Sequence, residues 1–395
     1  MKVLLVGNLA EDRQESMRRF TDLLDSGLRK LGHQTEQIAP TLRVARLGPK
    51  YRYSGVPKYL GYVDKFVLFP RQLRAHVQRT RPDVVHITDH SNAVYVPATR
   101  AAPTLVTCHD LLQVRAARGE IPQQQVGNFG RRYQAWILRH LARAPRIACV
   151  STKTQTDTAR LTGLDPARIT VVPNALNYPY ARLAPEIARD RISALAAASR
   201  VDAAQLISPP GGFLLNVGAA HWYKNRDGLL SIYAKLRQKL APVPKLVLVG
   251  TPLSGRDLAK ATTLGLTDHL ISFAAVSSEQ LESFYSLAEG LIFPSWEEGF
   301  GWPIAEAQAC GCPVFTSDRA PMTQVGGSAA VYFDPANSDA AAEAIATAWS
   351  ARDALRERGL LEAQRWEPKA MLSAYEAIYR ELAESFASRG KGALA

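Results

Sequence analysis

The sequence predicts an α/β protein of two doubly wound domains, each with a parallel sheet covered by helices on both faces. Short apolar runs alternate with amphipathic helical segments, and this series occurs twice along the 395 residues. The runs are nearly continuous in apolar residues, as expected when helices cover both faces of a sheet. Between the two series, the cluster Ser208-Pro209-Pro210-Gly211-Gly212 is typical of a domain boundary.

The first half carries the first series. Its expected helices are residues 14–31, 66–80, 129–144 and 152–162. Its expected strands are residues 2–7, 34–38, 83–87, 104–108, 146–150 and 169–172.

The second half restarts the pattern after an alanine-rich helix expected over residues 185–199. We therefore expect one domain over residues 1–178 and a second over 179–368, in which residues 179–212 include a linker. A last amphipathic helix, with no strand after it, leads us to expect residues 369–395 to pack back on the N-terminal domain. The expected strands of the second series are residues 213–217, 245–250, 270–273, 291–293, 313–316 and 331–333.

Charge is unevenly distributed along the chain. The formal net charge is +12, yet residues 41–146 alone hold 18 Lys or Arg against five acidic residues. This basic surplus favours an anionic partner, such as nucleic acid, an anionic membrane or a phosphorylated small molecule.

Membrane spans and disulfides are not expected. No apolar run approaches the roughly 18 residues that a span requires. Cys108, Cys149, Cys310 and Cys312 lie in apolar segments, which indicates free thiols in a reducing compartment, and we expect a cytoplasmic protein. Cys310 and Cys312 have no second Cys/His pair at ligand spacing, so we expect no metal site.

Polar residues follow several of the expected strands. Ligands of open parallel sheets bind outside the carboxyl ends of the strands, so we expect these residues to converge on a cleft between the domains. They are Asn8, Asp89, His90, His109, Asp110, Ser151, Lys224, Glu297 and Glu298.

The segment from Phe293 to Glu306 is the most informative one. A strand ends at Phe293, and we expect Pro303 to open a helix whose first turn includes Glu306. Gly299 and Gly301 allow a close backbone approach, and the helix start can bind an anion. Carboxylates accept hydrogen bonds from vicinal hydroxyls, so the segment suits a phosphate attached to a sugar.

Four segments together carry a family resemblance. The pattern Pro-Ser-x-x-Glu-Gly-Phe-Gly-x-Pro-x-x-Glu-Ala, which includes Glu298 and Glu306, resembles the nucleotide-sugar site of retaining glycosyltransferases of family 4 (glycosyl transferases group 1), which have the GT-B fold. The others are Asn216-Val-Gly-Ala-Ala-His-Trp-Tyr-Lys-Asn225, Ala309-Cys-Gly-Cys-Pro-Val314, and the pairs Gly326-Gly327 and Asp334-Pro335.

The resemblance implies a role for each matching residue of the second half. Glu306 would hold the ribose hydroxyls, Glu298 would bind hydroxyls of the donor sugar, and Lys224 would contact the diphosphate. The remaining donor-binding residues would be Gly218, Asn225, Ala275, Val276, Gly299, Phe300, Gly301, Trp302 and Pro303.

The sequence departs from the family pattern at three positions. Ala219 and Tyr223 stand where the family has arginines, so one of the two usual cations on the leaving diphosphate is missing. Arg226 and His221 are candidate substitutes. Gln324 stands where the family has a glutamate.

The first half resembles the family more weakly. In Thr104-Leu-Val-Thr-Cys-His-Asp110, the resemblance makes His109 the candidate that touches the donor sugar, so His109, Lys224 and Glu298 are the expected catalytic residues. On the acceptor side we expect Asn8, Ser151 and Asn174, although the loop after the first strand lacks the family's double glycine.

The expected function is retaining transfer of a sugar from a UDP- or GDP-sugar, used as substrate, to a glycan, lipid-linked or phosphorylated acceptor. No Asp-x-Asp motif is present, so we expect neither metal nor cofactor, and we favour same-face attack. A catalytically silent GT-B-like subunit and a sugar-nucleotide epimerase remain alternatives. Nucleic-acid binding lacks a supporting motif, and the first strand is not followed by the Gly-x-Gly-x-x-Gly of nicotinamide enzymes.

Two segments of the basic region mix cations with aromatic residues. They are Lys50-Tyr-Arg-Tyr53 and the stretch from Lys58 to Phe66. Such a mixture is typical of interfacial membrane segments, so we hypothesise peripheral binding to the inner face of the plasma membrane. A solvated basic face is the alternative.

Overall fold

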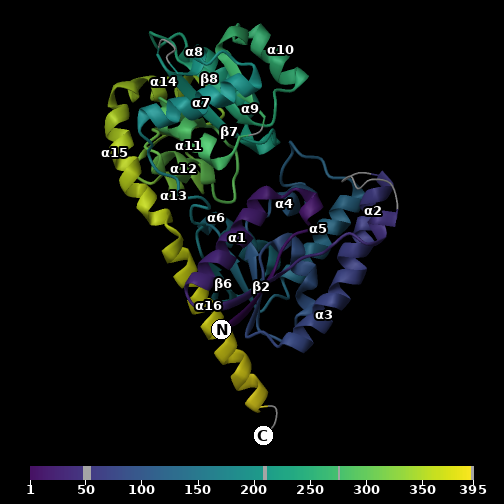
Figure 1. Ribbon diagram of the computed structural model, residues 1–395. Coiled ribbons are helices and arrows are strands. Elements are labelled where there is room, and N and C mark those ends of the chain that lie inside the picture. The colour runs from purple at the N-terminus through teal and green to yellow at the C-terminus, as the bar shows by residue number, and fades with distance from the viewer. Residues whose placement is uncertain (48–54, 208–210, 275, 393–395) are drawn as a thin grey trace. The chain divides into compact units, whose positions relative to one another are not determined.

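The computed structural model describes residues 1–47, 55–207, 211–274 and 276–392 (Figure 1). The chain divides into two compact units. Unit 1 comprises Met1–Asn177 and Pro368–Ala395, and unit 2 comprises Tyr178–Glu367. Residues 50–53, 208–210 and Ala275, which carry some of the predictions above, lie outside the described residues.

Unit 1 contains a six-stranded parallel sheet with the order β2-β1-β3-β4-β5-β6. Helices on both faces cover the sheet, so its strands are largely buried, apart from the edge strand β2. The strands are β1 (Lys2–Val6), β2 (Gln34–Ile38), β3 (Val84–Ile87), β4 (Thr104–Cys108), β5 (Arg146–Cys149) and β6 (Ile169–Val171).

The helices of unit 1 are joined by short turns of other types. A π-helical turn, Asp64–Leu68, connects α2 to α3, and a 3-10 segment, His90–Ala98, follows β3. The α-helices are α1 (Glu15–Lys30), α2 (Gly55–Val63), α3 (Phe69–Thr80), α4 (Leu112–Ala117), α5 (Asn128–Leu141), α6 (Thr152–Thr162) and α16 (Pro368–Gly392).

Unit 2 contains a second six-stranded parallel sheet, with the order β12-β11-β10-β7-β8-β9. Its strands are β7 (Phe213–Gly218), β8 (Lys245–Gly250), β9 (Leu270–Phe273), β10 (Gly290–Phe293), β11 (Val314–Ser317) and β12 (Ala330–Phe333). Its α-helices are α7 (Pro185–Ser199), α8 (Ala204–Ile207), α9 (Arg226–Leu236), α10 (Gly255–Thr263), α11 (Ser278–Leu287), α12 (Trp302–Ala309), α13 (Met322–Gly326), α14 (Ser338–Thr347) and α15 (Arg352–Ala363).

The predicted fold class is confirmed. All twelve predicted strands are present, and none of their ends differs from the prediction by more than one residue. The helix expected over 66–80 begins instead at Phe69, because the π-helical turn precedes it. No helix in the described part of the chain is long and apolar enough to cross a bilayer.

The segment of residues 179–212 contributes helix α7 to unit 2. Helix α7 lies against α11. The Glu282 carboxylate on α11 accepts a hydrogen bond from the Ala181 N–H at 3.1 Å and pairs with Arg191 at 3.1 Å. The alanine-rich sequence gives α7 small side chains at the contact, such as the buried Ala188 and Ala196, and these allow the two helices to pack closely.

Helix α16 packs on unit 1 through a buried polar network. Tyr379 and Tyr375 extend from α16, and the Tyr379 hydroxyl lies 2.8 Å from His86 Nδ1. His86 Nε2 lies 2.7 Å from the Thr107 hydroxyl, which in turn lies 3.1 Å from the Tyr375 hydroxyl. Because buried polar groups are costly when unpaired, this network fixes where α16 lies on the sheet.

Part of the basic, aromatic segment expected at a membrane faces the protein interior. The Asp64 carboxylate accepts hydrogen bonds from three consecutive backbone N–H groups, those of residues 43–45. Lys65 is buried and pairs with Asp12 at 2.5 Å. The hypothesis of a surface segment running from Lys58 to Phe66 is therefore wrong for these two charges, because each is already paired inside the fold.

We predict that His86 makes the stability of unit 1 depend on pH. Burial, with a smaller contribution from His109, lowers the pKa of His86 from 6.5 to about 3. The unfolded chain takes up a proton near pH 6.5 and the folded chain does not, so stability is lost as the pH falls below 6.5. We expect a loss of about 2 kcal/mol between pH 6.5 and pH 5, measured by urea unfolding.

The matched variants are His86→Gln and His140→Gln. His140 is a half-buried histidine on α5 that bonds to the Trp136 carbonyl at 2.9 Å. The pH dependence should flatten in His86→Gln and persist in His140→Gln. Equal slopes in the wild type and in His86→Gln would contradict the prediction.

Candidate functional site

Two loops meet at the carboxyl edge of the unit 2 sheet. One follows β7 and the other follows β10, and these strands are neighbours in the sheet. The Trp296 N–H donates a hydrogen bond to the Tyr223 carbonyl at 2.7 Å, which joins the loops through their backbones. Residues from two of the sequence motifs are thus held side by side.

Lys224 and Glu298 form an ion pair across these loops. Lys224 Nζ lies 2.7 Å from Glu298 Oε1, and the two side chains are only 18% and 9% exposed. Lys224 Nζ also lies 4.9 Å from the centre of the Phe293 ring, a cation–π contact. The structure therefore brings together two of the three expected catalytic residues, as one cation and one carboxylate in a partly desolvated setting.

Asn225 positions the loop from inside. Its backbone is left-handed, with φ 52°, and its side-chain oxygen accepts a hydrogen bond from the Gly228 N–H as the N-cap of α9. Its side-chain nitrogen donates to the carbonyls of Pro294 and Pro335, at 3.0 and 3.2 Å. The sequence analysis placed Asn225 among the donor-binding residues, whereas the structure uses both ends of its amide to tie three segments together.

A pair of glycines lets the ends of β7 and β8 come close together. Gly218 and Gly250 both have positive φ, at 150° and 130°, and they face each other in the parallel register. A Cβ at Gly250 would overlap the Gly218 carbonyl, so a larger residue there would displace the end of β7, from which the loop with Lys224 begins.

Helix α12 begins one residue earlier than expected. Gly301, with φ 101°, is its N-cap, Trp302 is its first residue and Pro303 its second. Glu306 therefore lies in the second turn, so the expectation that it belongs to the first turn is wrong. Phe300 is buried edge-on against Trp366, with the ring centres 5.2 Å apart, which anchors the preceding loop at Gly299.

Glu306 is buried beside Tyr285, which the sequence analysis did not single out. The Tyr285 hydroxyl donates to Glu306 Oε2 at 3.0 Å. Burial and the nearby Glu306 carboxylate raise the pKa of Tyr285 well above its usual value, so Tyr285 remains a donor. This bond orients the carboxylate and occupies one of its oxygens.

The loop expected to read a base is described only in part. Ala275 is outside the described residues, and Val276 is half-buried. The loop ends at α11, where Ser277 and Gln280 form a reciprocal capping box. The helix start after Val276 is therefore well defined.

The cations around the loop do not match the family pattern. Tyr223, in place of an arginine, stacks on His221 with the ring centres 5.3 Å apart. Arg226 binds the Thr251 carbonyl at 2.9 Å and pairs with Asp257 at 3.4 Å, so the 251–257 segment already engages it.

Arg319, which was not expected from the sequence, lies over the Trp296 ring at 4.8 Å. Arg319 lies in the loop that follows β11, and this position could have identified it from the sequence, because the loops after parallel strands gather at one edge of the sheet.

In unit 1, residues after β1 and β3 form one polar cluster. The Asn8 side chain donates to Asp89 Oδ2 at 2.6 Å and accepts from the Asn92 amide at 2.8 Å. Burial alone would raise the pKa of Asp89, but His90, His109 and hydrogen bonds from Asn8 and Ser91 hold it below its usual value. Asn8 also lines a cavity of about 300 Å³ between the first loop and α1.

His109 is held as a neutral, buried imidazole. It is 4% exposed and packs edge-on against Phe20, with the ring centres 4.7 Å apart. Its Nε2 lies 2.9 Å from the Thr88 carbonyl, which can only accept, so the proton is on Nε2 and Nδ1 has a free lone pair. Nδ1 is buried and has no hydrogen-bond partner among the described residues. Burial is the main reason that the pKa of His109 is lowered. Its contact with a donor sugar stays a prediction.

Ser151 and Asn174 lie after β5 and β6. The Ser151 hydroxyl caps α6 by accepting from the Thr154 N–H at 3.2 Å, so its side chain is used within the fold. Asn174 is buried, and neither its oxygen nor its nitrogen has a partner in the described part of the chain. Of the two, Asn174 keeps its hydrogen-bonding capacity for another molecule.

A metal site finds no support among the described residues, which contain no cluster of three or more His, Cys, Asp or Glu able to hold an ion. The four cysteines are free and buried.

Fold and site together define the class. Two parallel six-stranded sheets, with polar loops at their carboxyl edges, are the architecture of the GT-B glycosyltransferases. Sucrose-phosphate synthase from Thermosynechococcus elongatus has a similar fold, with a TM-score of 0.71 and 17% identity over 98% of this chain and 100% of that one. Alr3699/HepE of Anabaena, solved with UDP and glucose, gives a TM-score of 0.68 and 16% identity over 98% and 100% of the two chains.

The sequence comparisons specify the family. Residues 17–178 match Glycosyltransferase Family 4 and residues 200–361 match Glycosyl transferases group 1, and together these matches cover most of the chain. The protein belongs to the family 4 glycosyltransferases, which these two matches describe together.

Individual relatives are more distant. O-antigen chain mannosyltransferase B of Escherichia coli is 32% identical over 163 residues, which are 40% of this chain and 43% of that protein. A D-inositol 3-phosphate glycosyltransferase of Xylanimonas cellulosilytica is 26% identical over 310 residues, 76% of this chain and 70% of that protein. The match thus spans less than half of the first relative and about two thirds of the second.

We predict that Asn225→Ala destabilises unit 2 more than loss of a helix cap alone would. The variant loses the α9 cap, worth about 1 kcal/mol, and two buried hydrogen bonds worth about 1 kcal/mol each. Asn337→Ala is the matched control, because Asn337 caps α14 by accepting from the Ala340 N–H. Thermal unfolding should place Asn225→Ala clearly below Asn337→Ala. Asn225→Asp, which keeps the cap oxygen, should also unfold below Asn337→Ala, because its buried carboxylate would face the Pro294 and Pro335 carbonyls. Equal midpoints for the two alanine variants would count against the role given to Asn225.

Proposed function

We propose that the protein is a retaining glycosyltransferase that moves a sugar from a UDP- or GDP-sugar to a glycan, lipid-linked or phosphorylated acceptor. The observation that carries the proposal is the Lys224–Glu298 ion pair beside the start of α12. The pair supports the proposal because it supplies one cation for a diphosphate and one carboxylate for sugar hydroxyls.

Three charged residues each bind a different part of the donor. When the donor binds, the ion pair between Lys224 and Glu298 breaks and Lys224 contacts the diphosphate. Glu298 then accepts hydrogen bonds from sugar hydroxyls. Glu306, whose carboxylate is oriented by Tyr285, accepts hydrogen bonds from the ribose hydroxyls. The backbone at Gly301 and Trp302 lies at the positive end of α12, which favours an anion.

The chemical step requires stabilisation of charge on the leaving diphosphate. Fixed donors aimed at developing charge are commonly the largest catalytic contribution, and Lys224 with the start of α12 supplies them without a metal. Arg319, which lies over Trp296 of the same loop, is the proposed second cation in place of the arginines lost at Ala219 and Tyr223. Glu298 binds the donor, so we favour same-face attack in which the leaving phosphate oxygen accepts the acceptor's proton.

The relatives support this choice of substrates. Their names include a mannosyltransferase and D-inositol 3-phosphate glycosyltransferases, and one similar structure was solved with UDP-glucose. The UDP-glucose of that structure supports a sugar nucleotide as donor, and the inositol 3-phosphate in the relatives' names supports a phosphorylated acceptor.

A catalytically silent subunit is the second candidate. Two arginines of the family pattern are missing, Arg226 is engaged by the 251–257 segment, and Glu298 neutralises Lys224. Binding of nucleotide without any turnover would favour this candidate over the transferase.

The test combines binding with turnover. UDP, GDP, ADP and their common sugars are screened by thermal shift, and the best ligand is titrated by calorimetry. Glu306→Ala should weaken nucleotide binding about tenfold, because it removes a charged acceptor of two ribose hydroxyls. Hydrolysis or transfer of the matching nucleotide sugar should persist in EDTA.

The control is Glu343→Ala, since Glu343 is a surface glutamate on α14 that pairs with Lys239 at 2.6 Å. It should bind nucleotide like the wild type. Unchanged affinity in Glu306→Ala would refute the ribose role, and activity that EDTA abolishes and magnesium restores would refute a metal-independent reaction.

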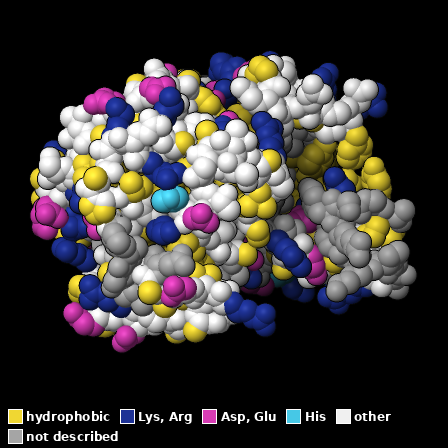
Figure 2. Space-filling view, turned by 90° about the horizontal axis from the view of Figure 1, so that it is seen from above, with side chains coloured by type: hydrophobic (Ala, Val, Ile, Leu, Met, Phe, Trp, Pro, Cys, Tyr) yellow, Lys and Arg dark blue, Asp and Glu magenta, His cyan; other side chains and the backbone are white. Residues whose placement is uncertain are grey.

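We also propose that unit 1 binds an anionic membrane peripherally, on the cytoplasmic face of the plasma membrane. Exposed aromatic residues gather where α2 and α5 meet: Tyr59 is 56% exposed and Phe129 is 53% exposed, with their ring centres 6.0 Å apart. Lys58 lies over the Tyr62 ring at 5.7 Å. Figure 2 shows apolar side chains, with Lys and Arg close by, on the right of the view in the region of α2. Exposed rings beside cations suit the headgroup region of a bilayer.

Flotation with vesicles tests this surface. The wild type should float with phosphatidylglycerol vesicles and not with phosphatidylcholine vesicles. The double variant Tyr59→Ser/Phe129→Ser should lose most of the binding, whereas Leu361→Ser, at a comparably exposed apolar residue of unit 2, should not. Equal absence from both kinds of vesicle would leave the basic surplus as a solvated face.

A further inference from the structure

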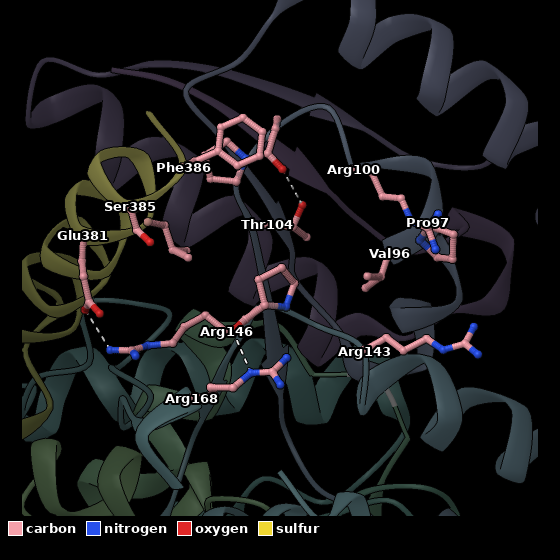
Figure 3. Close-up of a pocket in the computed structure, with 14 residues that line it drawn as sticks. Val96, Pro97, Arg100, Thr104, Arg143, Arg146, Arg168, Glu381, Ser385 and Phe386 are labelled. Carbon is pink, nitrogen blue, oxygen red and sulfur yellow. Dashed lines mark hydrogen bonds and ion pairs between the residues drawn. The ribbon is translucent and has the colours of Figure 1, made fainter. Parts of the chain in front are cut away.

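A second cavity of unit 1 lies at the edge of the sheet opposite to the loops described above. Its volume is about 820 Å³, and it is bordered by the starts of β4 and β5, by the segment that precedes β6, and by the last turns of α16 (Figure 3). Pockets of this size bind small molecules. None of the residues assigned to the donor or the acceptor lines it.

Four arginines line this cavity. Arg100 precedes β4, Arg143 and Arg146 precede or begin β5, and Arg168 precedes β6. Because β4, β5 and β6 are consecutive neighbours in a parallel sheet, residues that precede them are brought to one edge. In Figure 3, Arg146 reaches toward Glu381 of α16, while Arg100 and Arg143 lie on the side away from that helix.

The positive charge of these arginines is only partly balanced. Arg146 pairs with Glu381 at 2.8 Å, and Glu381 is the one carboxylate among the described residues that line the cavity. Arg168 donates to the Pro145 carbonyl at 3.2 Å, which fixes its position but leaves its charge uncompensated. Like charges held together cost free energy, and an anion would relieve that cost.

Two guanidinium groups remain available to a ligand. Arg100 and Arg143 are exposed, and their guanidinium groups have no hydrogen-bond or ion-pair partner in the described part of the chain. Arg146, in contrast, is engaged by the Ala167 carbonyl at 2.6 Å and by Glu381, and its Nε is buried. Guanidinium groups bind phosphate oxygens by paired N–H donors, so this set favours a phosphate over a singly bonded anion.

The other wall of the cavity is apolar. Phe386 of α16 is 44% exposed, and it borders the cavity together with Leu382 and Pro97. An exposed aromatic ring beside arginines suits a ligand with an apolar group attached to its phosphate.

We propose that this cavity binds an organic phosphate, with the phosphate on Arg100 and Arg143 and the apolar group against Phe386. The ligand is a phosphate ester, either a soluble one or the headgroup of a lipid. Glu381 is the anion of the cavity that competes with it for the positive charge. Binding here is independent of the donor site and of the proposed transfer reaction.

The test is calorimetric titration of the full chain with phenyl phosphate, inorganic phosphate and dihexanoyl phosphatidic acid. Arg100→Ala and Arg143→Ala should each weaken binding of phenyl phosphate about tenfold, as expected for loss of a charge-assisted pair of hydrogen bonds. Glu381→Gln should strengthen it severalfold, because it removes the competing carboxylate. Phe386→Ser should weaken phenyl phosphate and leave inorganic phosphate unchanged. Tighter binding of the short-chain lipid than of phenyl phosphate would identify the lipid as the source.

Arg74→Ala is the control for net charge, since Arg74 is exposed on α3 and does not line the cavity. It should bind phenyl phosphate like the wild type. Unchanged affinity in both arginine variants would overturn the proposal. So would loss of phenyl phosphate binding in Lys224→Ala alone, because the ligand would then occupy the donor site of unit 2.

Discussion

Parallel strand pairing is the constraint on which the rest of the structure depends. Every strand pair in the two sheets is parallel, so all loops that follow strands lie at one edge and all segments that precede strands lie at the other. The first edge of unit 2 gathers Lys224 and Glu298 from motifs that are 74 residues apart. The opposite edge of unit 1 gathers four arginines by the same geometry. One topological rule therefore explains both the candidate donor site and the remote basic cavity.

The loops that follow β7 and β10 are held in turn by hydrogen bonds inside unit 2. Asn225 uses its cap oxygen and its amide nitrogen to tie the β7 loop to Pro294 and Pro335, and the Trp296–Tyr223 backbone bond closes the same arrangement. These bonds hold Lys224 next to Glu298. In the proposed reaction, this ion pair opens when a diphosphate binds to Lys224, and Glu298 is then released to contact the sugar.

The site could be predicted from sequence in part. Strand-end position and residue type selected Lys224 and Glu298, because parallel sheets place such residues at a common edge. Glu306 was selected from the helix start after Pro303 and from the family resemblance. These signals could not separate residues that face a ligand from residues that face the fold. Asn225 and Ser151 have the same residue types and positions as ligand-binding groups, yet their side chains cap helices. Tyr285 and Arg319 were missed because their roles depend on partners that lie 21 and 23 residues away, Glu306 and Trp296.

The sequence by itself determined the two series of strands and their limits to within one residue, because buried parallel strands require continuous apolar runs. It also determined the family motifs, because loops that bind a ligand require particular residues. Tertiary structure alone decided which charges are available. Lys65 and Asp64, read from the sequence as part of a surface, are paired inside the fold, whereas Arg100 and Arg143 have no partner among the described residues and lie beside a cavity. The reason is physical: charge is visible in a sequence, but its compensation depends on neighbours in space, and folding brings those neighbours from distant parts of the chain.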